Sequence, residues 1–133
     1  MTQTPGAPPS LTLLRITHGI YALHALSILL AILGDSLIVA RFVFGLPSLV
    51  AVLLNYAFRH QAIGTPLAVH FRWQIRTFWF AALWFLASTL ILGPLLLIYI
   101  GGPLLLVAYV ATGIWTAYRI ARGWLALGNH RGP

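Results

Sequence analysis

The sequence predicts an all-α polytopic membrane protein with four transmembrane helices. Of its 133 residues, 60% are hydrophobic and only 7% are charged, which leaves too few charged side chains to cover a water-soluble domain. The apolar residues come in blocks of about 20, the length of helix that crosses the hydrocarbon core of a bilayer. Arginines bound these blocks, as is typical of the ends of membrane spans.

The charge of the chain is strongly one-sided. The chain has eight arginines and a single acidic residue, Asp35, so the formal net charge is +7. In a soluble protein this excess would suggest nucleic acid, but arginines beside apolar blocks indicate membrane topology and anionic lipid headgroups instead. A planar guanidinium also pairs with a phosphate through two contacts. The chain has no cysteine, which excludes disulfides, thiolate nucleophiles and cysteine metal sites.

We expect a membrane domain over residues 11–127 between two disordered tails. The polar, proline-rich segment 1–10 lacks the positive charge of a signal peptide, and 128–133 is the second tail. The first span covers about 11–33, and Ser10 is its expected N-cap.

The second span covers about 36–58 and is expected to be kinked or broken at Pro47. Proline cannot donate to the carbonyl of Val43, which predicts a kink. The break that begins at Gly45 could instead make this span a broken or re-entrant helix. Arg41 lies near enough to the start of the span for its guanidinium to reach the interface.

The third and fourth spans are expected over about 67–93 and 103–125, and a hydrophilic connection at 59–66 precedes the third. The segment 95–100 is too apolar for an exposed loop. It is either the end of the third span beyond a kink at Pro94 or a membrane-buried turn.

The distribution of arginines predicts the topology. With four spans, both termini share one side with Arg15, Arg59, Arg72, Arg76, Arg119, Arg122 and Arg131. Only Arg41 and Asp35 fall on the other side. The positive-inside rule therefore places both termini in the cytoplasm.

The sharpest candidate site is a polar cluster at the start of the third span. Its residues are His70, Arg72, Trp73, Gln74 and Arg76, and Arg119 and Arg122 join it from the end of the fourth span. Such a cluster could bind an anionic lipid headgroup or a protein partner at the cytoplasmic mouth of a bundle. The alternative is an ordinary interfacial helix start whose arginines meet phosphates generally.

Three polar residues fall inside or beside spans: His18, His24 and Asn55. A polar side chain within a span is a functional candidate by default. The two histidines point about 120° apart on a helix, so they cannot form one ligand pair. His24 with His70 could clamp a haem, which is the weakest alternative; we expect no cofactor and no metal.

A ridge of small residues, Gly113, Ala117 and Ala121, recurs every four positions in the fourth span. This spacing allows another helix to approach closely. In an alanine-rich chain the same spacing also arises by chance.

The chain lacks the groups of classical enzymes, so we expect no enzymatic activity. One acidic residue excludes a carboxylate pair and an acidic triad, and no histidine spacing resembles a zinc site. We expect an accessory or assembly subunit that binds lipid and a membrane partner or a second copy. The alternative is a small transporter, channel or translocase component, because prolines at 47, 94 and 103 break the helices.

Several motifs carry a family resemblance. They are Thr17, His18, Tyr21 and His24 early in the chain, Asn55 and Tyr56, then His70, Phe71, Arg72, Trp73, Gln74, Ile75, Arg76 and Thr77, and finally Tyr118, Arg119, Arg122 and Trp124. With them the chain resembles a family of small bacterial inner-membrane proteins of unknown function. That family is distantly similar to the channel-type subunit of the chloroplast inner-envelope protein-import translocon. The resemblance implies a four-helix membrane fold in a bacterial inner membrane and no assigned activity. Arg76 stands near a position where the family has an amide.

Overall fold

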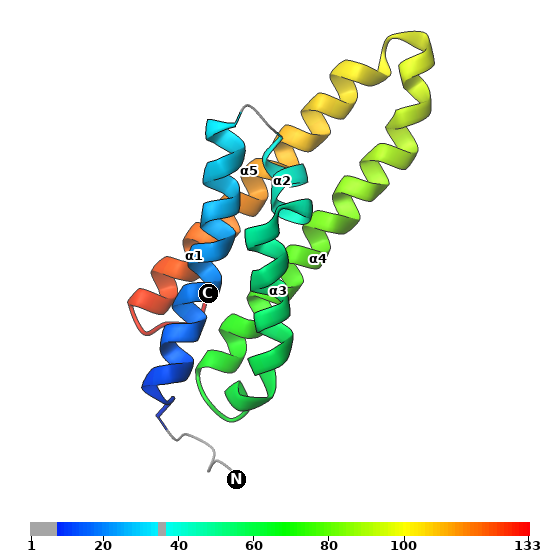
Figure 1. The fold of residues 1–133 in the computed structure, drawn as a ribbon. Coiled ribbons are helices and arrows are strands. Elements are labelled where there is room, and N and C mark those ends of the chain that lie inside the picture. Colours follow the sequence, from blue (N-terminus) through cyan, green and yellow to red (C-terminus); the bar gives the residue numbers. More distant parts are fainter. Residues whose placement is uncertain (1–7, 35–36) are drawn as a thin grey trace.

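The structure is a computed structural model that describes residues 8–34 and 37–133, and it confirms the all-α expectation (Figure 1). The helices are α1 (Leu11–Leu33), α2 (Ile38–Phe44), α3 (Leu46–Phe58), η1 (Arg59–Ala62), α4 (Leu67–Leu92), η2 (Gly93–Ile98) and α5 (Gly101–Gly128). The described part of the chain contains no strand. Residues 1–7 of the expected N-terminal tail, and Asp35, lie outside the described residues.

The first span begins where its capping residue predicts. The Ser10 hydroxyl accepts a hydrogen bond from the backbone N–H of Leu13 at 3.2 Å, which satisfies one of the free donors of the first turn. The buried face of α1 recurs at helical spacing and is unusually polar. It consists of Leu13, Thr17, Ile20, Tyr21, His24, Ser27, Ile28 and Ala31.

The predicted second span consists of two helices in the structure. α2 ends at Gly45, whose backbone is extended, and the segment Ile38–Phe44 is bent by 50° from Leu46–Ala62. Pro47 lies in the first turn of α3, where a missing N–H leaves no helical hydrogen bond unmade. The proline therefore starts a new helix instead of kinking a continuous one. Three helices are long and apolar enough to cross a membrane, or four if the bent pair counts as one span.

The helices α4 and α5 form a hairpin that extends past α1 and α2 (Figure 1). Tyr109 stacks on Phe85 at 5.0 Å and its hydroxyl lies 2.7 Å from that of Thr89. Beyond these contacts η2 continues α4 as a 3-10 helix, as the first of the two alternatives for 95–100 expects. The chain then reverses at Tyr99, which has a positive φ of 62°.

Packing of α5 against the bundle uses only part of the predicted small-residue ridge. Its buried stripe is Gly113, Thr116, Ile120, Gly123 and Leu127, together with Gly101 and Leu105 nearer the tip. Gly113 lies against α2, where a Cβ atom would come within 3.0 Å of the Ile38 Cβ. Ala117 is half-buried and Ala121 is exposed. The second small residue of α5 that packs closely on neighbouring helices is therefore Gly123, against Tyr21 and Trp73, and not Ala121.

Candidate functional site

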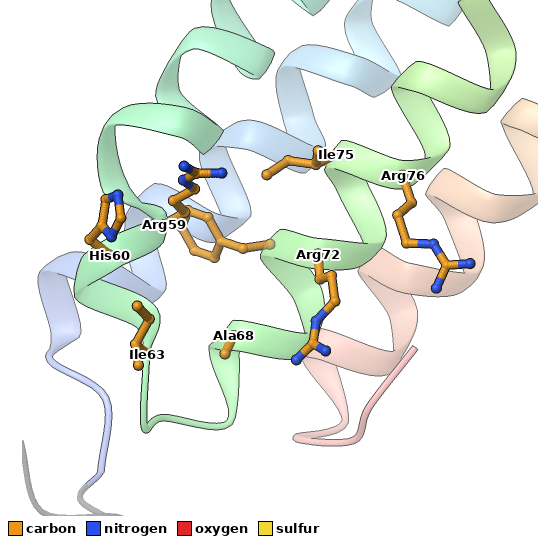
Figure 2. Close-up of a pocket in the computed structure, with 8 residues that line it drawn as sticks. Arg59, His60, Ile63, Ala68, Arg72, Ile75 and Arg76 are labelled. Carbon is orange, nitrogen blue, oxygen red and sulfur yellow. The ribbon is translucent and has the colours of Figure 1, made fainter. Parts of the chain in front are cut away.

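A pocket of about 360 Å³ opens between η1 and the start of α4 (Figure 2). Its lining combines basic and apolar side chains: Arg59, His60, Ile63, Ala68, Phe71, Arg72, Ile75 and Arg76. Arg59 and His60 come from η1, whereas Arg72 and Arg76 come from successive turns of α4 (Figure 2). The short 59–66 connection brings these two walls together. We call these eight residues the arginine pocket.

The positive charge of the arginine pocket has no acidic counterpart in the described structure. Arg59, Arg72 and Arg76 are all exposed, and the only acidic side chain in the chain, Asp35, lies outside the described residues. Aromatic rings support two of the guanidinium groups: Arg59 lies 5.1 Å from the Tyr56 ring centre and Arg76 lies 5.8 Å from that of Phe80. The guanidinium donors therefore remain available to an external anion.

Arg119 is held between two tryptophans and has a structural position. Its guanidinium carbon lies 3.6 Å from the centre of the Trp73 ring and 4.9 Å from that of Trp115. Its Nε donates to the Thr77 hydroxyl at 2.9 Å, and the Trp73 indole N–H donates back to the Arg119 carbonyl at 3.1 Å. This clamp joins α4 to α5, while Arg122 remains exposed at 5.8 Å from the Trp73 ring centre.

His70 lies inside the bundle and not on the arginine pocket, although the sequence groups it with Arg72. Its Nε2 lies 2.8 Å from the Arg131 carbonyl oxygen, which can only accept, so this nitrogen carries the proton. Its Nδ1 is therefore the acceptor for the Tyr21 hydroxyl at 3.1 Å. The segment expected to be a disordered C-terminal tail is thus hydrogen-bonded here, because Arg131 also donates its N–H to the Ala126 carbonyl at 2.8 Å.

A second candidate site is a column of buried polar side chains at the centre of α1, α3 and α4. Its members, which we call the polar column, are Tyr21, His24, Ser27, Ser48, Asn55, His70 and Gln74. All are 3% exposed or less. At the α2 end, Ser27 donates to the Arg41 carbonyl at 2.8 Å, and His24 Nδ1 lies 3.0 Å from the Ser48 hydroxyl.

Helical spacing places Gln74 in the middle of this column. On α4, His70 bonds to Tyr21, and Phe78 lies 6.5 Å from the His24 ring. Gln74 is one turn from each of them, so it faces α1 between Tyr21 and His24. Asn55 lies two turns along α3 from Ser48 and is likewise fully buried.

The column contains polar atoms that have no hydrogen-bond partner within the described residues. They are His24 Nε2 and both amide atoms of Asn55 and of Gln74. A buried polar atom without a partner costs about 1–3 kcal/mol, so such atoms are rare in native proteins. In a membrane span they mark candidate binding sites or pathways.

The remaining histidines do not form a ligand set. His18 accepts a hydrogen bond from the Trp124 indole at 3.1 Å, which ties α1 to α5. Both ring nitrogens of His70 are engaged, so a haem between His24 and His70 would have to displace one of these bonds. Among the described residues no group of three histidine or acidic side chains could hold a metal.

Several contributors to these sites escape the sequence analysis, among them Arg59, Ser48 and Gly123, which packs against Tyr21. Arg59 could have been found, because a short connection brings the end of one helix beside the start of the next. Ser48 also carries a signal, since it precedes Asn55 by two helical turns. Gly123 carries none, because nothing in the sequence indicates that Tyr21 packs against it.

Comparison of the chain with protein-family models, with curated proteins and with solved structures finds no match. The family resemblance noted from the motifs therefore stays a prediction. The geometry of the arginine pocket and the polar column is what bears on function.

Proposed function

We propose that this protein is a non-enzymatic integral membrane subunit that binds anionic lipid headgroups in the arginine pocket and a membrane partner at the same end of the bundle. The observation that carries the proposal is the composition of the pocket. Arg59, Arg72 and Arg76 supply donors for a phosphate, while Phe71 and Ile75 supply an apolar wall. This pairing suits a phospholipid, which presents a charged head beside acyl chains.

The placement of charge in the bundle supports an interfacial location for the pocket. α1 begins and α5 ends on the side opposite the hairpin tip, and the pocket lies on that same side (Figure 1). Seven of the eight arginines belong to segments at this end. Under the positive-inside rule this end faces the cytoplasm of a bacterial cell.

Replacing Arg72 and Arg76 together by alanine is expected to weaken binding of short-chain phosphatidylglycerol. Each basic residue near an anionic surface contributes about 1 kcal/mol, so the double variant should bind roughly 30-fold more weakly. The measurement is a titration of detergent-solubilised protein, supported by native mass spectrometry of retained lipid.

A matched control removes the same charge elsewhere. Arg15 and Arg131 are exposed and lie outside the pocket, so R15A/R131A should bind within about twofold of the unmodified protein. Equal losses in the two double variants would show that net charge alone governs binding, and the pocket proposal would then be wrong.

The polar column favours a second candidate function, a small transport or translocation component. One end of the column, at Ser27 and Ser48, lies at the helix break at Gly45, and broken helices in membranes commonly line cavities. Protein reconstituted in liposomes should then pass protons, ions or small polar solutes, and Asn55→Leu should reduce that flux. Liposomes that stay tight to all of these solutes would exclude this function.

A further inference from the structure

The α4–α5 half of the molecule has a longer charge-free segment than the half formed by α1, α2 and α3. No charged residue and no histidine occurs from 77 to 118, a stretch of roughly 40 residues that makes up most of the α4–α5 hairpin. Arg76 and the clamped Arg119 mark its base. From Arg119 to Gly101 the rise of α5 is about 27 Å, close to the thickness of a bilayer's hydrocarbon core.

The tip of this hairpin offers an almost entirely apolar surface. Its exposed large side chains include Leu90, Ile91, Leu96, Leu97, Ile98, Tyr99, Ile100, Leu106 and Val107. Leaving such a surface in water is unfavourable by about 25 cal/mol per Å². The absence of charge and the matching length identify the occupant of this surface as bilayer hydrocarbon.

The end of α1 and the start of α2 lie half-way along the hairpin; we call their described residues, 31–34 and 37–41, the α1–α2 turn. Ala31 and Ile32 of α1, with Leu37 and Ile38, share a surface hollow with Tyr109, Val110 and Ile114 of α5. Val110 lies midway between Gly101 and Arg119, so the turn lies about 13 Å from either end of the charge-free part of α5. The ring centres of Phe44 and Phe85 lie 5.5 Å apart, and Phe85 also stacks on Tyr109. The end of α2 therefore lies beside the same part of the hairpin.

This turn carries a charge that hydrocarbon would disfavour. Arg41 is exposed, and one guanidinium nitrogen lies 3.6 Å from the position that a Cβ atom would take at Gly34. The Arg41 guanidinium thus lies at the C-terminal end of α1, where the last carbonyls of a helix need hydrogen-bond partners. An arginine at the bilayer centre costs at least about 2.5 kcal/mol unless water reaches it.

We propose that the bilayer is indented beside α1 and α2, so that water reaches the α1–α2 turn about half-way through the membrane while the α4–α5 hairpin crosses its full thickness. The indentation ends directly above the polar column, because Ser27 bonds to the Arg41 carbonyl and His24 lies one turn below Ser27. The apolar path across the membrane is therefore shortened on this side of the protein. This inference depends on membrane insertion of the hairpin and not on lipid binding by the arginine pocket.

Single cysteines test the proposal directly, because the natural chain has none. The probe is a membrane-impermeant maleimide applied to proteoliposomes, with the hairpin tip facing outward. Leu33→Cys reports on the end of α1, and Leu90→Cys and Val107→Cys report on the hairpin between Val110 and the tip; these leucines and the valine are 74%, 66% and 66% exposed. We expect Leu33→Cys to react at least about tenfold faster than the other two, because a thiol in hydrocarbon rarely ionises.

Two other patterns would overturn the proposal. Rapid labelling at all three positions would mean that the hairpin protrudes into water and the bilayer is level with the α1–α2 turn. Protection at all three would mean that hydrocarbon covers the turn as well. Labelling in dodecyl sulfate gives the intrinsic reactivity of each thiol, and tryptophan fluorescence of each variant verifies that it is folded.

Discussion

Replacing Gly123 by alanine is expected to destabilise the bundle by about 1–3 kcal/mol, since overpacking a tight core displaces its neighbours. An added Cβ atom would lie 2.5 Å from the Tyr21 hydroxyl oxygen and 3.0 Å from Trp73 Cδ1. Tyr21 is fully buried and bonded to His70, so it cannot move aside without losing that bond. The measurement is thermal unfolding in detergent followed by tryptophan fluorescence, where the midpoint should fall by roughly 5 °C.

Gly19→Ala is the matched control. Gly19 is an exposed glycine within α1, and an added Cβ atom would meet nothing within 4 Å. Alanine in a helix is more favourable than glycine by about 0.5–1 kcal/mol, so this variant should be slightly more stable. The two glycine-to-alanine changes should therefore shift the unfolding midpoint in opposite directions, and a Gly123→Ala protein as stable as the Gly19→Ala protein would refute the packing argument.

Replacing both buried amides by apolar side chains of similar shape is expected to stabilise the fold. Asn55→Leu and Gln74→Met remove four polar atoms that have no partner in the described structure. Each change should raise the free energy of unfolding by about 1–3 kcal/mol, the cost of an unpaired buried polar group. Unfolding by denaturant in detergent provides the measurement.

Ser48→Ala is the contrasting variant, because it removes a made hydrogen bond and leaves His24 Nδ1 unpaired. It should destabilise the protein by about 1–3 kcal/mol. If the two amide variants were destabilised like Ser48→Ala, the amides would have partners in the membrane, and the account of unpaired atoms would be wrong. A stabilised double variant that loses solute flux would assign the amides to transport.

The helices were largely predictable because their signals are local. The serine at position 10 caps the helix that begins at Leu11, and the glycine and proline at 45 and 47 separate α2 from α3. The apolar block that begins at Leu67 forms α4. The height of the hairpin relative to α1 was not predictable, since it depends on which levels of α5 pack against α2. That register is decided by contacts such as Ile38 with Gly113, which lie far apart in the sequence.

The candidate sites were predictable only in part, for a similar reason. The four-residue spacing of Arg72 and Arg76 correctly places both on one exposed face of α4. His70 and Gln74 have the same spacing and face inward instead. Apolar residues surround both pairs, so the sequence pattern alone does not show which face the bundle covers; the partner of His70 is Tyr21, from a different helix.

The clamp around Arg119 has a consequence for the dependence of the protein on ionic strength. It holds a cation with two indole rings and a hydroxyl instead of a carboxylate, and dissolved ions screen such close contacts little. Arg59, Arg72 and Arg76 are exposed, so their attraction to phosphates weakens as the Debye length shortens from about 10 Å at 0.1 M salt to about 3 Å at 1 M. Raising the salt concentration should therefore release bound anionic lipid while α4 and α5 stay joined, which separates the recognition of lipid from the integrity of the fold in a single titration.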